Sequence, residues 1–179
     1  WTFGQPKDEV DRVASGLIQL GIHPGEKVAL WMPNRPEWIH SLFAVAKIGA
    51  VLVPINTRFR TNDLEYVVRQ SDSETLITVD RSGPVDYLGM VRELCPEGET
   101  GDPNRLCPEA FPELRRIVVL GDTNYRGTVR WEEILSSSGA TPPRELEHRQ
   151  QMVDPDSPAL IMYTSGTTGF PKGVVHTHN

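Results

Sequence analysis

Apolar residues recur at intervals of three and four in three segments of the first 80 residues, a spacing typical of amphipathic helices. The first segment ends at Gly21, a common helix stop, and the second runs from Pro36, which suits a first helical turn, to Gly49. Thr61 or Asn62 can cap the third. The apolar positions are Val10, Val13, Ala14, Leu17 and Leu20 in the first segment, Trp38, Ile39, Leu42, Phe43 and Ala46 in the second, and Leu64, Val67 and Val68 in the third.

Short uninterrupted apolar runs separate these helices and predict buried strands over residues 28–32, 51–55 and 75–79. Pro54 lies at the end of its strand or on a sheet edge, because proline cannot donate to a β-ladder. Strands that alternate with amphipathic helices are typical of a layered α/β domain with flanking helices. We therefore predict an α/β fold with a largely parallel sheet.

The middle of the chain departs from this alternation. Residues 81–113 are rich in Pro, Gly and Glu and predict a short helix over 85–94, followed by an exposed excursion. A strand over 117–120 resumes the alternation, and a helical turn is predicted over 131–135. Residues 136–156 are polar and predict a surface connection with one helix over 144–152.

Composition places the chain among ordinary globular proteins and excludes several classes. Its 179 residues, 38% hydrophobic and 23% charged, suit one well-packed domain. The net charge of -6 argues against nucleic-acid binding, and no apolar run approaches the roughly 20 residues of a membrane span. The chain starts at Trp1 without an initiator methionine, so we expect residues before it. No pattern indicates an oligomeric state.

Cysteine and histidine usage gives no metal site. We interpret Cys95 and Cys107 as reduced thiols of a cytoplasmic protein, because a secreted disulfide scaffold has more cysteines. His176 and His178 are one residue apart, but no third ligand is near them in the sequence. No metal ligand is therefore assigned.

The segment after residue 158 carries the chemistry. Residues 159–163 predict a buried strand and residues 174–177 a second β-prone run, so the intervening loop joins two strands. Its glycines let backbone N–H groups approach an anion, its hydroxyls donate hydrogen bonds, and its lysine supplies a positive charge. The candidate phosphate-binding residues are Thr164, Ser165, Gly166, Thr167, Thr168, Gly169, Phe170, Pro171 and Lys172.

Two common phosphate loops do not match this segment. The nucleoside-triphosphatase loop needs Gly-Lys-Ser/Thr, whereas Lys172 lies between Pro171 and Gly173. A kinase loop needs Gly-x-Gly-x-x-Gly, and only Gly166 and Gly169 are present at suitable spacing. By composition alone, an ordinary turn without a ligand is an equal alternative.

The string from Tyr163 to Val174 closely resembles the signature of the AMP-binding, adenylate-forming superfamily. Its members include acyl-CoA synthetases, firefly-type luciferases and the adenylation domains of nonribosomal peptide synthetases. Residues 21–29, 32–34 and 47–56 resemble other stretches of the family, so the likeness covers nearly the whole chain and is weakest over 81–158.

The resemblance implies that residues 1–179 are the N-terminal portion of the AMP-binding domain. In the family, this loop wraps the β- and γ-phosphates of ATP while a substrate carboxylate attacks the α-phosphorus. ATP, Mg²⁺ and CoA are thus the implied cofactor and co-substrates, and the partners are small molecules. The family's acyl, adenine and ribose contacts lie mostly further along the chain, so we assign no catalytic residue here and expect residues 1–179 alone to be inactive.

Residues 86–96 and 111–121 resemble bacterial fatty-acyl-CoA ligases. This resemblance favours a medium- or long-chain fatty acid–CoA ligase of lipid metabolism. Two alternatives stay open, an aryl- or amino-acid-activating relative and a noncatalytic nucleotide-binding fragment.

Overall fold

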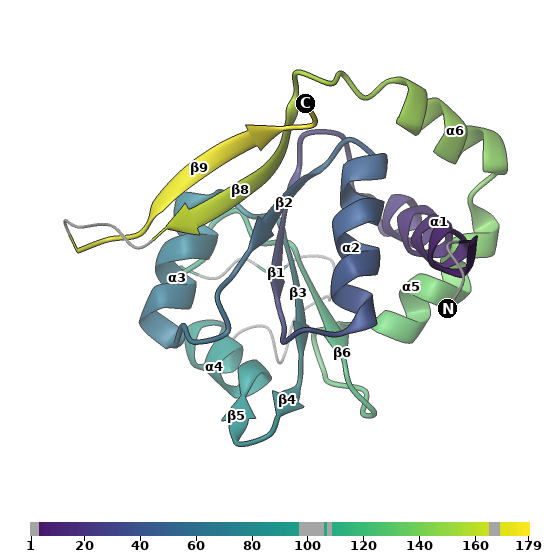
Figure 1. The fold of residues 1–179 in the computed structure, drawn as a ribbon. Helices are drawn as coiled ribbons and strands as arrows, with labels where there is room; N and C mark the ends of the chain where they lie inside the picture. The colour runs from purple at the N-terminus through teal and green to yellow at the C-terminus, as the bar shows by residue number, and fades with distance from the viewer. Residues whose placement is uncertain (1–3, 97–105, 107–108, 165–168) are drawn as a thin grey trace.

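A largely parallel β-sheet with helices on both faces organises the chain (Figure 1). The computed structural model describes residues 4–96, 106, 109–164 and 169–179. In this part, seven strands form one sheet in the order β7-β6-β3-β1-β2-β8-β9. Their bounds are β1 Lys27–Trp31, β2 Val51–Pro54, β3 Thr75–Val79, β6 Arg116–Leu120, β7 Val129–Arg130, β8 Pro158–Thr164 and β9 Lys172–Thr177. The predicted α/β fold class is confirmed.

The helices form two layers. They are α1 Gly4–Gln19, α2 Pro36–Lys47, α3 Thr61–Gln70, α4 Tyr87–Leu94, α5 Trp131–Ser137 and α6 Pro143–Gln151, with a 3₁₀ turn η2 over Ser138–Ala140 and a small hairpin of β4 Arg81–Ser82 and β5 Val85–Asp86. The chain moves from β1 to β2 through α2 and then crosses back to β3 through α3. Parallel crossovers are right-handed, so this reversal puts α2 and α3 on opposite faces (Figure 1).

Strand pairing is parallel from β7 through to β8, and only β8 and β9 run antiparallel. The predicted strands over 28–32, 51–55, 75–79, 117–120 and 159–163 lie within one residue of their observed bounds, and β9 begins two residues earlier than predicted. Pro54 ends β2. Gly21 and Gly49 follow helices with φ of 84° and 77°, a conformation that glycine adopts without strain. None of the described helices is long and apolar enough to cross a membrane.

The centre of the sheet is the core of the domain. Trp31, at the end of β1, is fully buried, and its Nε1 donates to the backbone oxygen of Asn56 at 3.2 Å. Its ring meets the edge of Tyr87 with centroids 4.7 Å apart, so α4 is fixed against β1. Leu64, Val67 and Val68 are buried as the pattern of α3 predicted.

The orientation of α2 differs from its apolar pattern. The face with Ile39 and Phe43 is exposed, at 45% and 56% of their side-chain surfaces, whereas Trp38 and Leu42 are only partly buried. The packed face consists of His40, Ser41, Ala44 and Val45. Small residues allow α2 to approach its neighbours closely, and this packing determines which face turns inward.

Three further expectations need correction. The residue before α3 is Arg60, whose backbone N–H donates to the Asp63 carboxylate at 3.0 Å, so neither Thr61 nor Asn62 is the cap. Strand β8 was predicted to be buried, but each of its residues is either exposed or intermediate. Most of the predicted excursion, over 97–105 and 107–108, lies outside the described residues. Its flanking residues Leu106, Phe111 and Leu114 are buried in the core rather than exposed.

The contact between α1 and α5 generates a test of the fold. A Cβ added at Gly16 would lie 2.1 Å from the backbone oxygen of Ile134. Alanine is favoured over glycine in helices by about 1 kcal/mol, but this clash involves backbone and costs about 1–3 kcal/mol. We expect Gly16→Ala to lower the free energy of unfolding of the 179-residue chain, measured by urea denaturation. Gly139→Ala is the matched control, because a Cβ there meets nothing within 4 Å. A gain in stability for both variants would contradict the packing described.

Candidate functional site

The hairpin of β8 and β9 places the candidate loop at one edge of the sheet. Thr164 pairs with Lys172, and Tyr163 pairs with Gly173, so the loop leaves and re-enters the sheet at a single point. Because β8 runs parallel to β2, this point lies at the carboxyl ends of the parallel strands, where α/β proteins commonly bind ligands. The hairpin extends past α3 at the left of Figure 1. The prediction that the loop joins two strands is confirmed.

The structure describes both ends of the predicted loop. Ser165, Gly166, Thr167 and Thr168 lie outside the described residues. At the entry, the Thr164 hydroxyl lies 3.5 Å from the backbone oxygen of Lys172. At the exit, Gly169 has a φ of 104°, which is accessible to glycine and strained for other residues. The phosphate-binding role of these nine residues stays a prediction.

Lys172 has an exposed side chain at the first position of β9. Among the described residues, no carboxylate lies within ion-pair distance of its ammonium group. A compact ammonium group without an internal partner is suited to phosphate oxygens. The end of the hairpin therefore presents a positive charge to solvent.

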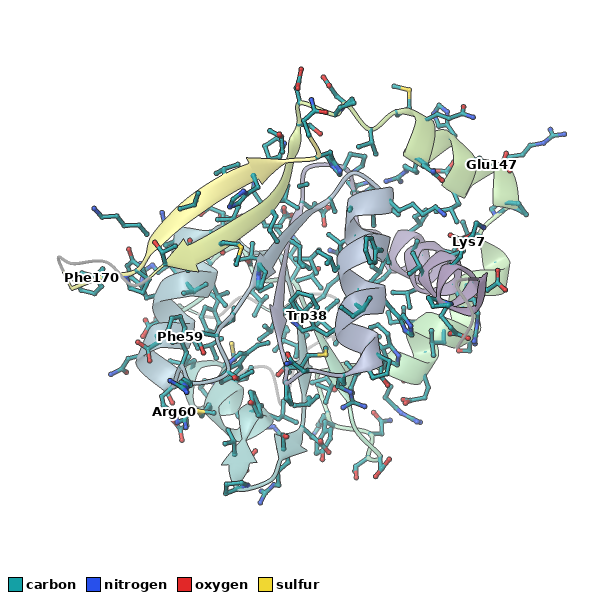
Figure 2. All side chains as sticks on the ribbon, in the orientation of Figure 1. Lys7, Trp38, Phe59, Arg60, Glu147 and Phe170 are labelled. Atoms are coloured by element: carbon teal, nitrogen blue, oxygen red, sulfur yellow. The ribbon has the colours of Figure 1, made fainter. Side chains whose placement is uncertain are left out.

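Helix α3 contacts the exit arm of the loop through Tyr66. The Tyr66 hydroxyl donates to the backbone oxygen of Pro171 at 3.1 Å. Its ring stacks on Phe170, with centroids 5.1 Å apart and planes inclined by 28°. Figure 2 shows Phe170 at the outer end of the hairpin, with 67% of its side chain exposed. The phenol of Tyr66 thus contacts the two residues that precede Lys172.

The entry arm is held by the same helix. The Tyr163 hydroxyl donates to Oε1 of Gln70, which lies one turn after Tyr66. Burial raises the pKa of Tyr163 to about 12, with the nearby Tyr66 as a smaller cause, so this phenol is a hydrogen-bond donor at neutral pH. Gly173, opposite Tyr163, leaves room for the ring: an added Cβ would lie 3.3 Å from it.

Sequence reasoning missed Tyr66 and Gln70. Tyr66 is partly buried against the core and Gln70 is exposed. They are four residues apart, a spacing that places two side chains on the same helix face. This four-residue spacing was the sequence signal that could have identified Tyr66 and Gln70 as a pair. It does not reveal the partner, because Phe170 and Pro171 are about a hundred residues away in the sequence.

The larger cavities do not coincide with the loop. One of about 720 Å³ lies between α1, α2 and α5 and is lined by Asp8, Glu37, His40 and Trp131 among others. Another, of about 640 Å³, lies beside β8 and β9 and includes Ile161 and Val175. In the described ranges, no three His, Cys, Asp or Glu side chains come together as metal ligands would.

The chain is an α/β domain whose strand-loop-strand hairpin lies at the carboxyl edge of the sheet, and comparison with known proteins gives its family. Residues 1–179 match the AMP-binding enzyme family over their whole length. The chain therefore belongs to the AMP-binding enzyme family.

Two curated relatives carry acyl-CoA ligase names. YngI of Bacillus subtilis (strain 168), which bears the name of an acyl-CoA synthetase, is 38% identical over 178 residues, covering 99% of this chain and 32% of YngI. The human mitochondrial medium-chain acyl-CoA ligase ACSF2 is 32% identical over 179 residues, with 29% of its length covered. The chain thus spans about a third of the length of the relatives that it matches.

Two solved structures share the fold of this chain. The anthranilate CoA ligase AuaEII in complex with anthranoyl-AMP is 27% identical, with a TM-score of 0.76 over 99% of this chain and 30% of AuaEII. MbtA of Mycobacterium smegmatis in its apo form is 28% identical, also with a TM-score of 0.76, and 29% of it is covered.

The environment of Tyr163 predicts that its phenol ionises at a higher pH than an unperturbed tyrosine. Because burial raises its pKa to about 12, the folded protein keeps this proton above pH 10, where an unperturbed tyrosine of pKa about 10 loses it. The stability that this phenol contributes is therefore fully present below about pH 10 and is lost as the pH rises through about 12.

We expect the difference in phenolate absorbance between the wild type and Tyr163→Phe to show one group that titrates near pH 12. An ultraviolet titration of the two proteins measures this. A phenolate that appears near pH 10 in the folded protein would contradict the half-buried, hydrogen-bonded position of Tyr163.

Proposed function

We propose that the full-length protein activates a medium- or long-chain fatty acid with ATP, forming acyl-AMP and then acyl-CoA. The observation that carries the proposal is the hairpin end at the carboxyl edge of the sheet. There the exposed Lys172, which has no ion-pair partner among the described residues, follows a loop rich in Gly and Thr. Membership of the AMP-binding enzyme family and the acyl-CoA ligase names of the relatives support it.

In this proposal, residues Thr164 to Lys172 bind the β- and γ-phosphates of ATP. A substrate carboxylate oxygen attacks the α-phosphorus, and the bond from that phosphorus to the bridging oxygen breaks, so pyrophosphate leaves with its electron pair. Lys172 and the loop N–H groups stabilise the growing negative charge because they are already positioned when the bond breaks. In a second step the thiol sulfur of CoA bonds to the acyl carbon, the acyl–phosphate bond breaks, and AMP and the thiol proton are released.

Mg²⁺ is the cation that this chemistry calls for, and it would neutralise part of the phosphate charge. It binds few protein oxygens and several phosphate or water oxygens. The residues present fit a bound Mg²⁺, because the Thr164 hydroxyl lies at the entry of the loop. Further hydroxyl residues follow it in the sequence. No step of the mechanism needs a further metal ligand from residues 4–179.

We propose further that residues 1–179 are the N-terminal portion of a larger AMP-binding domain and that the protein acts in the cytoplasm. The likeness to AuaEII, an anthranilate CoA ligase, favours aryl-acid activation as the second candidate function. Both candidates share the phosphate loop and differ in the acid that attacks.

The role of Lys172 predicts a defect confined to adenylation. Loss of a charge-assisted contact costs about 1.5–3 kcal/mol, so we expect Lys172→Ala in the full-length protein to slow ATP–pyrophosphate exchange by roughly 10- to 150-fold. Lys7→Ala is the control, because Lys7 is exposed, pairs with Asp11 at 2.8 Å and lies on the opposite side of the domain (Figure 2). If Lys172→Ala shows a normal rate of ATP–pyrophosphate exchange but slow thioester formation, the role assigned to Lys172 is wrong.

The choice of acid tests the proposed function. We expect the full-length protein to release pyrophosphate faster with octanoate or longer fatty acids than with benzoate, anthranilate or amino acids. In the same assay, residues 1–179 alone are expected to release none, because misplacement of reacting groups is costly and this portion supplies contacts to the leaving group only. Faster release with aryl acids would establish the second candidate, and release by residues 1–179 would overturn the division of roles.

A further inference from the structure

We propose that Tyr66 is a positioning residue for the phosphate loop and that α3 holds both arms of the loop through Tyr66 and Gln70. This inference rests on the proposed function, because the loop is taken to bind ATP phosphates. It concerns the described residues on either side of the loop.

Helix α3 is a rigid base for such contacts. Leu64 and Val67 have no exposed surface and Val68 only 1%, so one face of the helix is fixed in the core. Tyr66 and Gln70 project from the same helix towards the hairpin. Sites supported by a packed helix keep their geometry better than sites supported by loops alone.

Tyr66 makes two contacts that have different requirements. The hydrogen bond to the backbone oxygen of Pro171 needs only the hydroxyl, whereas the stacking on Phe170 needs two rings. Proline has a fixed φ, so fixing its carbonyl group also limits the direction in which Lys172 leaves the loop. The hydroxyl of Tyr66 therefore acts on the position of the Lys172 ammonium group through one peptide unit.

Phe170 supports the positioning role of Tyr66, because Phe170 is 67% exposed. A large apolar side chain at a hairpin end adds nothing to the core, and the Phe170 ring stacks on that of Tyr66. On the entry arm, the bond from Tyr163 to Gln70 ties the residue before Thr164 to the same helix. Both described arms of the hairpin are thus attached to α3.

A positioning role predicts an effect on ATP more than on the acid. Without the clamp, the free loop samples more arrangements, and part of the binding free energy of ATP is spent on ordering it. We expect Tyr66→Phe, which keeps the ring, to raise the KM for ATP in pyrophosphate exchange by about 2- to 10-fold. Tyr66→Leu should raise it roughly tenfold or more, while the KM for the fatty acid stays within about twofold.

The experiment uses the full-length protein with MgATP and five variants, which are Tyr66→Phe, Tyr66→Leu and the three that follow. Tyr125→Phe is the matched control, because the Tyr125 hydroxyl also donates one hydrogen bond, to Asp80 at 2.8 Å, at the opposite end of the sheet. Phe170→Leu and the double variant Tyr66→Leu/Phe170→Leu test the stacking. If the two rings act as a unit, the double variant changes the KM for ATP by much less than the product of the single effects.

A second measurement does not depend on activity. Trypsin cleaves after Lys172, and we expect Tyr66→Leu to be cleaved there several-fold faster than the wild type, with no change in the melting temperature beyond that of Tyr125→Phe. Equal cleavage rates, or a KM for ATP that Tyr66→Phe and Tyr125→Phe change alike, would overturn the inference. If the wild type shows no exchange with any acid, the proposed function fails, and the cleavage rates alone then decide whether Tyr66 holds the loop.

Discussion

The parallel pairing of β8 with β2 is the interaction on which the candidate site depends. It joins Leu52 to Leu160 and fixes the direction of β8 relative to the buried strands β1 and β2. Because the strands are parallel, Thr164 emerges at the carboxyl edge of the sheet, and the antiparallel return of β9 makes the loop a hairpin end. An antiparallel β8 would put the same loop at the opposite edge of the sheet. The backbone ladder therefore brings the chemistry and its support together.

Local patterns predicted much of this architecture, because the spacing of apolar residues and the glycine and proline signals act over a few residues. The strands β1, β2, β3 and β6 and the helices α1 to α3 follow from them. Features that depend on contacts between distant segments could not be predicted from these local patterns. The inward face of α2 is chosen by the close packing of Ser41 and Ala44 rather than by the larger Ile39 and Phe43. The exposure of β8 likewise reflects which layers cover it, which its own apolar residues do not specify.

In the candidate site too, local sequence predicted some features, and others depend on contacts between distant segments. The loop sequence identified the hydroxyls, the glycines and Lys172 as groups suited to phosphate, because that suitability belongs to the residues themselves. The support from Tyr66 and Gln70 is a tertiary contact across about a hundred residues, which a single sequence does not encode in any local pattern. Family membership supports the proposed reaction, and the chain spans about a third of its relatives' length.

The central claim is that the segment from Thr164 to Lys172 binds the β- and γ-phosphates of a nucleotide. Hydrogen–deuterium exchange of the full-length protein tests it directly, because bound phosphates occupy backbone N–H groups. Peptides that cover β8, the loop and β9 should be protected by MgATP and by magnesium pyrophosphate, and much less by AMP, which lacks those phosphates. Equal protection by AMP and ATP, or no change in this segment with saturating MgATP, would contradict the claim.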